Sequence, residues 1–182
     1  MKFYSLTPAR VLEGTINSVV IKDSLSKINK SGIISQAKKE TWGDFVTSSF
    51  GKPFNIIKEL DLKDLEKEIY SMVRYYCTAH NHDLNLDLED SWINVTDKYG
   101  FQNTHFHGYR YISGTLYLDA YSELQGVIGF SPPSEYREWL PKELKIIPET
   151  GKILVFYGGL LHQVSYNKTE IPRMSLSFNY RF

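Results

Sequence analysis

The chain has 182 residues, with 21 Lys and Arg against 21 Asp and Glu, so its formal net charge is zero. This length predicts one domain over residues 1–182, long enough to bury a core without cross-links. A balanced charge without basic stripes gives no reason to expect a nucleic-acid partner, and we see no apolar run of the length that a membrane span needs.

The N-terminal part, residues 1–85, is expected to be helical and extended support for the C-terminal part. Residues 15–29 are compatible with a helix, and residues 31–53 with loop and short extended pieces. The clearest helix is predicted over residues 62–79, where Leu62, Leu65, Ile69, Met72, Val73 and Tyr76 form one apolar stripe at spacings of three and four. The single cysteine, Cys77, lies on this helix and excludes an intrachain disulfide, which fits a reducing, cytoplasmic compartment.

From residue 90 onward the pattern changes to the alternation of β-strands. Short β-rich runs separated by Gly, Pro, Asn and Asp are found at residues 91–96, 111–119, 126–131, 143–147, 152–157, 162–166 and 173–181. Many short strands with regular turns predict a sandwich or barrel. The expected class is therefore α+β, with a jelly-roll-like β core over residues 86–182.

The last predicted strand alternates strictly. Arg173, Ser175, Ser177 and Asn179 fall on one face, and Met174, Leu176, Phe178 and Tyr180 fall on the other. Two interpretations are open at this point. The polar face is either in water, as on an ordinary surface strand, or it lines a hydrated pocket while the apolar face covers the helices.

Three of the five histidines are candidate metal ligands. His105 and His107 are two residues apart, so on extended backbone both imidazoles face the same way, and His162 begins a distant predicted strand. His80 and His82 have the same spacing, but they sit at a helix end without a companion motif. We interpret this second pair as a polar helix terminus and loop.

Arg173 and Ser175 follow His162 on a common strand face. A guanidinium binds a carboxylate through two parallel hydrogen bonds, and a hydroxyl can add a third. This combination suits the far carboxylate of a dicarboxylic acid.

Seven blocks in order carry a resemblance to a known family. They are Trp92-Ile93-Asn94, His105-Phe106-His107, Ser113-Gly114-Thr115-Leu116-Tyr117, Pro148-Glu149-Thr150-Gly151, Leu154-Val155-Phe156, His162 and Arg173-Met174-Ser175-Leu176-Ser177-Phe178-Asn179. In these blocks the chain resembles the 2OG-Fe(II) oxygenase family, in a branch common in marine bacteria and phages. The resemblance covers residues 90–182 well and the N-terminal half loosely.

The resemblance implies a double-stranded β-helix that uses Fe(II), 2-oxoglutarate and O₂. It implies that His105, His107 and His162 bind iron and that Arg173, helped by Ser175, binds the distal carboxylate of 2-oxoglutarate. Tyr117 is a further candidate donor to that carboxylate. Asn94 is a candidate for the other end of the cosubstrate or for the substrate.

The chain departs from the wider superfamily at two places. His107 stands where an Asp or Glu is usual; if His107 does not bind the metal, Asp97 and Asp119 are the nearest acidic candidates. Tyr157-Gly158-Gly159 stands where relatives have a Pro and a bulky residue, which indicates a more mobile turn or a closer approach of substrate. The segment between Pro132-Pro133 and Pro141 is interpreted as a loop, with a lid over the site as its alternative.

The resulting hypothesis is an oxygenase that hydroxylates a polar small-molecule or peptidyl substrate in the cytoplasm of a bacterium or a phage-infected cell. No membrane partner is expected, and the hypothesis admits a homodimer. Two alternatives remain at this point: a non-catalytic jelly-roll binding module, such as a virion or host-interaction protein, and a cupin-like metal enzyme that does not use 2-oxoglutarate.

Overall fold

A computed structural model describes residues 10–39, 43–51, 55–80, 85–132 and 143–182 of the chain. Its helices are α1 (Ser18–Ser31), α2 (Ile33–Gln36), α3 (Ile56–Glu59) and α4 (Lys63–Ala79), with a 3₁₀ turn η1 (Glu123–Gln125). Its strands are β1 (Val11–Thr15), β2 (Lys38–Lys39), β3 (Gly43–Ser48), β4 (Asp87–His105), β5 (Tyr111–Asp119), β6 (Ile128–Phe130), β7 (Leu144–Ile146), β8 (Lys152–Tyr157), β9 (His162–Val164) and β10 (Arg173–Arg181).

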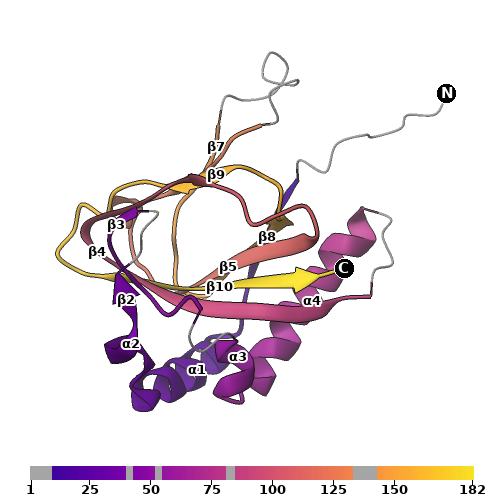
Figure 1. Cartoon of the computed structure of the whole chain (residues 1–182), viewed down its shortest axis with the longest axis horizontal. Helices are drawn as coiled ribbons and strands as arrows, with labels where there is room; N and C mark the ends of the chain where they lie inside the picture. The colour runs from indigo at the N-terminus through magenta and orange to yellow at the C-terminus, as the bar shows by residue number, and fades with distance from the viewer. Residues whose placement is uncertain (1–9, 40–42, 52–54, 81–84, 133–142) are drawn as a thin grey trace.

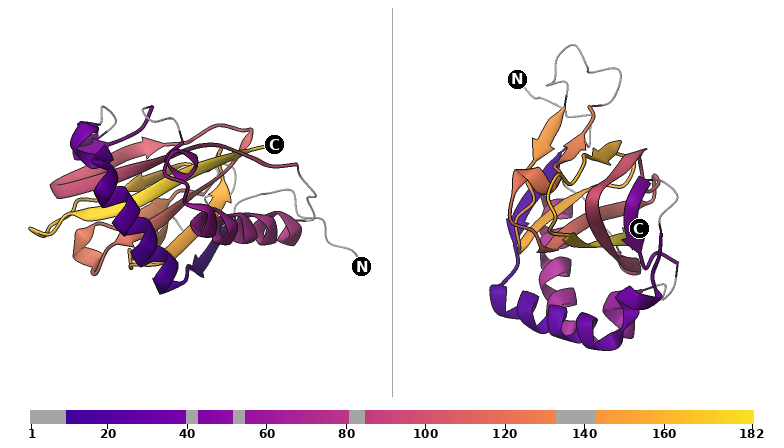
Figure 2. Two further views of the ribbon diagram at one scale, coloured as in Figure 1. Left: turned by 90° about the horizontal axis from the view of Figure 1, so that it is seen from below. Right: turned by 90° about the vertical axis from the view of Figure 1, so that its left-hand side faces the viewer.

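The strands form one antiparallel sheet that curls into a half-barrel above the helices (Figure 1). Their order is β1-β8-β5-β10-β4-β9-β6-β7, and β3 pairs with β4 and with β2. The end-on view of Figure 2 shows helices gathered against one outer face of this curl. Helical support and a curled β core are what the sequence predicts.

Helix α4 forms where the sequence predicts a helix, one residue later than expected at its start. Leu65, Ile69 and Val73 are buried along its stripe and face the underside of the sheet. Each such side chain contributes roughly 1.5–3 kcal/mol to folding. Cys77 is buried and free on the same helix, as expected.

The other N-terminal expectations need adjustment. The helix predicted at 15–29 is α1, which begins after Asn17; the Asn17 side chain accepts a hydrogen bond from the backbone of Val19, at 2.8 Å. The helix ends at Gly32, whose φ of 69° lies in the left-handed region that favours glycine. Within residues 31–53 the structure adds the short helix α2 to the expected extended pieces.

The polar face of β10 is inside the barrel. Arg173, Ser175, Ser177 and Asn179 are buried, so the surface-strand interpretation of this alternation is wrong. The opposite face of the same strand places Leu176, Phe178 and Tyr180 in the apolar core shared with the helices. A second apolar cluster, which includes Phe130, Phe156 and Val164, fills one end of the barrel interior.

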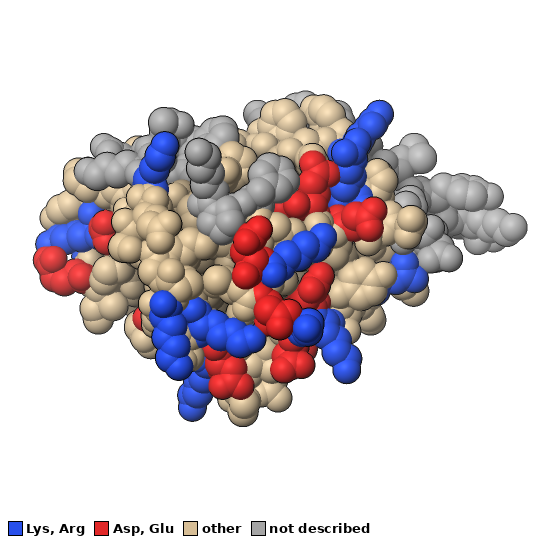
Figure 3. Space-filling model, turned by 60° about the horizontal axis from the view of Figure 1, so that its bottom comes forward, with Lys and Arg blue, Asp and Glu red and all other residues tan. Residues whose placement is uncertain are grey.

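None of the described helices is long and apolar enough to cross a membrane. On the helical face seen in Figure 3, Lys and Arg side chains alternate with Asp and Glu, so this view shows no area of one charge sign.

Candidate metal and cosubstrate site

The structure brings His105, His107 and His162 together at the mouth of the barrel. His105 ends β4, His107 follows two residues later, and His162 starts β9 directly opposite His105 in the strand pairing. One potential ligand atom from each histidine lies within 4.8 Å of the other two. Three imidazoles at this separation can share one divalent ion.

The hydrogen bonds of these histidines fix which ring nitrogen is free. His105 Nδ1 lies 2.7 Å from the backbone oxygen of Asn103, and His162 Nδ1 lies 2.8 Å from that of Leu160. A carbonyl oxygen only accepts, so each Nδ1 carries the proton and each Nε2 keeps its lone pair for a metal.

His107 is held by a side chain instead of the backbone. Its Nδ1 lies 2.7 Å from Asn179 Oδ1, which also accepts from Ser113 Oγ at 2.7 Å. The Asn179 amide nitrogen donates to Asp90 Oδ1 at 2.8 Å. A carboxylate oxygen accepts only, so Asp90 sets the orientation of the amide and Asn179 in turn sets the tautomer of His107.

Burial keeps these imidazoles neutral. It lowers the pKa of His107 to about 4, against the opposing effect of the hydrogen bond with Asn179. Burial also lowers the pKa of His105, and it lowers the pKa of His162 well below 6.5 with help from the two neighbouring histidines. Metal binding requires the neutral ring, and imidazole suits iron among other transition metals.

A cavity runs from the histidines into the barrel and ends at Arg173. Its walls include Asn94, Tyr117, Ser175 and Ser177 together with the three histidines. The Tyr117 ring centroid lies 5.9 Å from Arg173 Cζ, and burial raises the pKa of Tyr117 to about 12 although Arg173 opposes that rise. Asn94 accepts from Ser48 Oγ at 2.7 Å. The four cosubstrate candidates of the sequence therefore line one cavity.

Arg173 is the largest fully buried side chain of the described residues, and none of them supplies a carboxylate partner for it. Its Nη1 donates to the backbone oxygens of Gln125 and Gly126, at 2.9 and 2.7 Å, and its Nη2 donates to Thr96 Oγ1 at 3.1 Å. The buried Nε has no hydrogen-bond partner within the part of the chain that the structure describes. A buried cation without a counter-ion is expensive unless an anion binds, and the Nε–Nη2 edge is the side that a carboxylate can use.

The glycines of Tyr157-Gly158-Gly159 serve close packing. Gly158 O accepts from His107 N at 2.8 Å, and a Cβ on Gly158 would lie 2.7 Å from Gly108 O. Gly158 is thus pressed against the segment that holds His107, which accounts for glycine here without a mobile turn.

The fallback ligands lie elsewhere. Asp97 is exposed, and Asp119 borders a surface hollow beside α1. His80 ends α4 and bonds to Tyr76 O at 2.8 Å, as a helix terminus should. His82 and the proposed lid at residues 133–142 lie outside the described residues.

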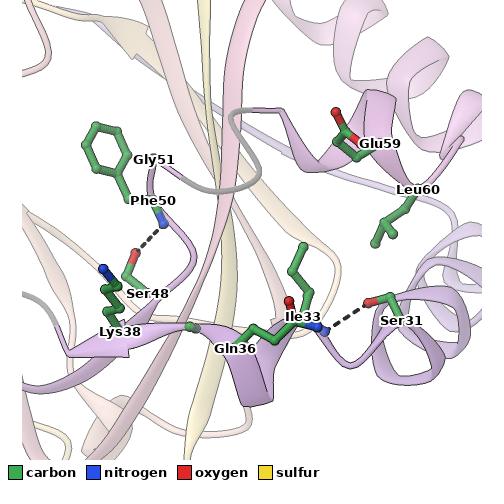
Figure 4. Close-up of a pocket in the computed structure, with 10 residues that line it drawn as sticks. Ser31, Ile33, Gln36, Lys38, Ser48, Phe50, Gly51, Glu59 and Leu60 are labelled. Atoms are coloured by element: carbon green, nitrogen blue, oxygen red, sulfur yellow. Dashed lines mark hydrogen bonds between the residues drawn. The ribbon is translucent and has the colours of Figure 1, made fainter.

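A larger hollow, of about 670 Å³, lies between α1, α2, β3 and α3 (Figure 4). Two of its hydroxyls already accept backbone hydrogen bonds, Ser48 from Phe50 and Ser31 from Ile33, each at 3.2 Å. No histidine lines it among the described residues, and its Lys38 and Glu59 are exposed. The chemistry-bearing side chains converge in the barrel and not here.

Residues 90–179 match the family model described as "Putative 2OG-Fe(II) oxygenase". This span begins at the carboxylate that orients Asn179 and ends at Asn179 itself. It includes every metal and cosubstrate candidate of the chain. No curated protein matches the chain.

Many solved structures resemble the fold, among them the following three. The non-heme alpha ketoglutarate dependent carbocyclase SnoK of nogalamycin biosynthesis aligns with a TM-score of 0.75 and 11% identity over 94% of this chain and 79% of its own. The epimerase SnoN, in complex with Fe³⁺, alpha ketoglutarate (2-oxoglutarate) and nogalamycin RO, aligns with a TM-score of 0.71 and 12% identity. This alignment covers 94% of this chain and 78% of SnoN. A prolyl hydroxylase from Trichoplax adhaerens, in complex with a peptide fragment of hypoxia inducible factor, aligns with a TM-score of 0.70 and 13% identity. This alignment covers 94% of this chain and 82% of the hydroxylase.

These alignments confirm the double-stranded β-helix that the sequence predicts. The family match and the histidine cluster indicate the cofactor set. Residues 90–179, just under half of the chain, match the 2OG-Fe(II) oxygenase family, and this match together with the histidine cluster indicates an oxygenase with Fe(II), 2-oxoglutarate and O₂ as its cofactor set.

Proposed function

We propose that this oxygenase is a hydroxylase whose iron is held by His105, His107 and His162 and whose 2-oxoglutarate is held by Arg173 and Ser175. The observation that carries the proposal is the buried Arg173, which has no carboxylate partner among the described residues, in a cavity that also has three neutral imidazoles in its walls. A cation that is expensive to bury alone and three aligned ring nitrogens are explained together by a metal-bound dicarboxylate.

The donor set fits iron(II). All three histidines keep Nε2 free because their Nδ1 protons are committed to Asn103, Leu160 and Asn179. Three protein ligands leave coordination positions for a bidentate cosubstrate and O₂. His107 takes the ligand position at which the wider superfamily has an Asp or Glu, and Asn179 orients its ring.

The cavity that ends at Arg173 is narrow. Its free volume is about 40 Å³, room for roughly three water molecules, so its walls must separate somewhat when 2-oxoglutarate enters. Arg173 supplies the guanidinium edge and Ser175 a hydroxyl at the closed end. In this proposal the Tyr117 hydroxyl donates to the same carboxylate, and Asn94 binds the other end of the cosubstrate or the substrate.

The bound iron and 2-oxoglutarate supply the oxidation of a substrate C–H bond by O₂, with 2-oxoglutarate converted to succinate and CO₂. The protein's own residues bind, orient and exclude water. Leu154, Phe156 and Phe130 close the barrel end with apolar side chains. Hydroxylation of a polar or peptidyl substrate is the proposed outcome, and a product one oxygen atom heavier than the substrate distinguishes it from epimerisation or ring closure.

A non-catalytic binding module would retain the strands without a reason to bury Arg173 unpaired. A cupin-like enzyme that does not use 2-oxoglutarate would retain the histidines but would use Arg173 for its substrate. Binding of 2-oxoglutarate itself therefore separates the three functions.

The test is anaerobic titration with Fe(II) and 2-oxoglutarate, followed by the visible metal-to-cosubstrate absorption band. Arg173→Ala should bind metal normally and lose roughly 2–5 kcal/mol of cosubstrate binding, since the carboxylate is left without its partner. Arg173→Lys should recover only part, because an ammonium cannot reproduce the fork. His162→Ala should lose most of the bound iron and keep its fold.

Arg181→Ala is the matched control. Arg181 lies on the same strand, is half-exposed and pairs with Glu89, so neither ligand should bind differently. The proposal is wrong if Arg173→Ala binds 2-oxoglutarate as tightly as the parent, or if His162→Ala retains stoichiometric iron.

A further inference from the structure

A second cavity, which we call the outer cavity, opens beside the histidines. It measures about 360 Å³, and Phe50, Asp90, Trp92, Gln102, His105, Phe106, His107, Tyr111 and Asn179 line it. Four of these, Trp92, Gln102, His105 and His107, also line the cavity that ends at Arg173. Two of the three proposed iron ligands, His105 and His107, thus line both cavities.

The two cavities are ordered along one pair of strands. In the pairing of β4 with β10, Thr96 stands opposite Arg173, and Asp90 stands opposite Asn179. Six residues of extended strand separate these two rungs, which is about 20 Å. The fixed positive charge of Arg173 therefore lies at the inner end of the site and the carboxylate of Asp90 at its outer end.

Asp90 has no cationic partner among the described residues. The neighbouring Glu89 is occupied: it accepts from Tyr111 OH at 2.9 Å and lies 3.5 Å from Arg181 Nη1. Among the described residues only the Asn179 amide donates a hydrogen bond to Asp90, through Oδ1, so Oδ2 is available to a ligand. No Lys or Arg is found among the described side chains that line the outer cavity.

The charge balance of the loaded site leaves Asp90 uncompensated. Metal-bound imidazoles are neutral, so the charges of a divalent iron and a doubly negative 2-oxoglutarate cancel. Burial raises the pKa of Asp90 to about 6, with Glu89 adding to the rise and Asn179 opposing it, which is what an ionised carboxylate lacking a counter-ion shows. At neutral pH the outer cavity holds one net negative charge.

The remaining walls are aromatic. Phe50 and Trp92 meet edge to face with ring centroids 5.0 Å apart, and Trp92 lies 5.6 Å from the His107 ring. Phe106 and Tyr111 complete the lining. Aromatic faces attract organic cations and also cover the aliphatic carbons next to them.

We infer that the outer cavity binds the alkylammonium group of the substrate, with Asp90 as its counter-ion and the aromatic side chains around its aliphatic part. This inference rests on the proposed function and names its substrate class. Asp90 is two hydrogen bonds from His107, so its carboxylate lies on the order of 10 Å from the metal position. The carbon that reacts is then only a few bonds from the ammonium.

Calorimetric titration of the Fe(II)- and 2-oxoglutarate-loaded protein under argon tests the inference. The probes are two isosteric pairs: N-acetyl-lysine methylamide with N-acetyl-6-hydroxynorleucine methylamide, and pentylamine with pentanol. Each cation should bind at least tenfold more tightly than its neutral partner. The first pair represents a peptidyl substrate and the second a small molecule, so the tighter cation identifies the source.

Asp90→Asn keeps the shape and an acceptor for Asn179 but removes the charge. We expect it to weaken the binding of both cations at least tenfold and to leave the neutral probes within twofold. Asp87→Asn, the same change at an exposed position of the same strand, should alter nothing. Asp87→Asn should keep the iron content and 2-oxoglutarate affinity of the parent. Both quantities are also measured for Asp90→Asn, because Asp90 orients Asn179 and through it His107.

The inference is overturned if neither cation binds, if the neutral probes bind as tightly, or if Asp90→Asn leaves cation binding unchanged while iron and 2-oxoglutarate still bind. Failure of the parent to bind iron or 2-oxoglutarate would instead overturn the proposed function, and the inference with it. The comparison of charged with neutral probes on the parent holds even if a variant fails to fold.

Discussion

Asn179 is the side chain that connects the metal ligands to the outer cavity. Its carbonyl oxygen accepts from His107 and Ser113, and its amide nitrogen donates to Asp90. The other two histidines need no such residue, because backbone oxygens hold them. Asn179 is therefore a positioning residue for His107 and a link between the negative charge of Asp90 and the metal.

Removing Asn179 should loosen the metal. In Asn179→Ala the His107 ring loses its acceptor, and we expect a 10- to 100-fold weaker iron affinity, the usual effect of losing the partner of a metal-bound histidine. Asn179→Asp keeps an acceptor, so its iron affinity should be restored while its unfolding temperature falls, because two carboxylates then face each other. Competition with a chelator measures the affinity. Parent-like affinity in Asn179→Ala would contradict this role.

Asp90 should make the stability of the metal-free protein depend on pH. Its pKa is raised from 3.8 to about 6 in the folded state, so its stabilising contribution is complete below pH 3.8 and is lost as the pH rises through 6. The groups facing it are Asn179, Glu89, Tyr111 and His107. Asp90→Asn should therefore raise the unfolding temperature at pH 7.5 and lose this advantage near pH 4. Thermal unfolding of both proteins between pH 4 and pH 7.5 checks this prediction. A difference in unfolding temperature that stays constant over this range would contradict it.

Strand β4 places the ligands because it bends. Its 19 residues pair first with β10 and then with β9. Between these parts Tyr99 has a φ of 65°, and a Cβ on Gly100 would lie 2.6 Å from Phe45 O. Asn167 fastens the bend through backbone bonds with Tyr99 and Gly100, at 2.6 and 2.9 Å. Because of the bend, the end of β4 leaves β10 and pairs with β9, so that His105 lies opposite His162.

The turn before β9 should tolerate no side chain at its first glycine. Gly158→Ala puts a methyl group against Gly108 O and the Tyr111 side chain, and such overpacking costs about 1–3 kcal/mol. Because Gly108 follows His107 directly, iron affinity should fall as well. Gly14→Ala is the control: its Cβ meets the flexible end of Met72 at 3.1 Å, and the iron site is not involved. Chemical denaturation measures the free energy of unfolding of both variants, and competition with a chelator measures their iron affinity. Equal losses in Gly158→Ala and Gly14→Ala would contradict the explanation.

At the scale of the molecule, the curled sheet separates two environments. Below it, α1, α3 and α4 cover the apolar core, as the left view of Figure 2 shows for the crossing helices. Inside the curl, β10 presents a row of buried polar side chains, which includes the cosubstrate candidates Arg173 and Ser175. The N-terminal region also contributes strands, because β1 extends the sheet beside β8 and β3 pairs with β4.

Residues 86–182 should therefore not fold alone, although they contain the whole family match. Without the first 85 residues, the fully buried Leu116, Ile153, Val155, Leu176 and Phe178 would face water. Their burial is worth on the order of 10 kcal/mol together, which is comparable to the entire stability of a small domain. Circular dichroism and thermal unfolding of this fragment test the point. A cooperative transition like that of the full chain would contradict it.

Local patterns were enough to predict part of this protein. The stripe of α4 and the alternation of β10 reflect periods of 3.6 and 2 residues, which depend on neighbours along the chain. The same alternation places Arg173 and Ser175 on one face, and the spacing of His105 and His107 makes them candidate partners. These features needed no knowledge of the chain's path.

Other features were decided by contacts between distant residues. Alternation along β10 could not tell water from a barrel interior, because that depends on what β4, β5 and β9 place around it. Asp90 and Asn179 are 89 positions apart, and the link through them to His107 exists only in the register of β4 with β10. The sequence around Gly158 indicates a mobile turn, but in the structure Gly158 packs against Gly108. Long-range packing chooses among arrangements that local propensity leaves equal, and here it set the polarity of the site.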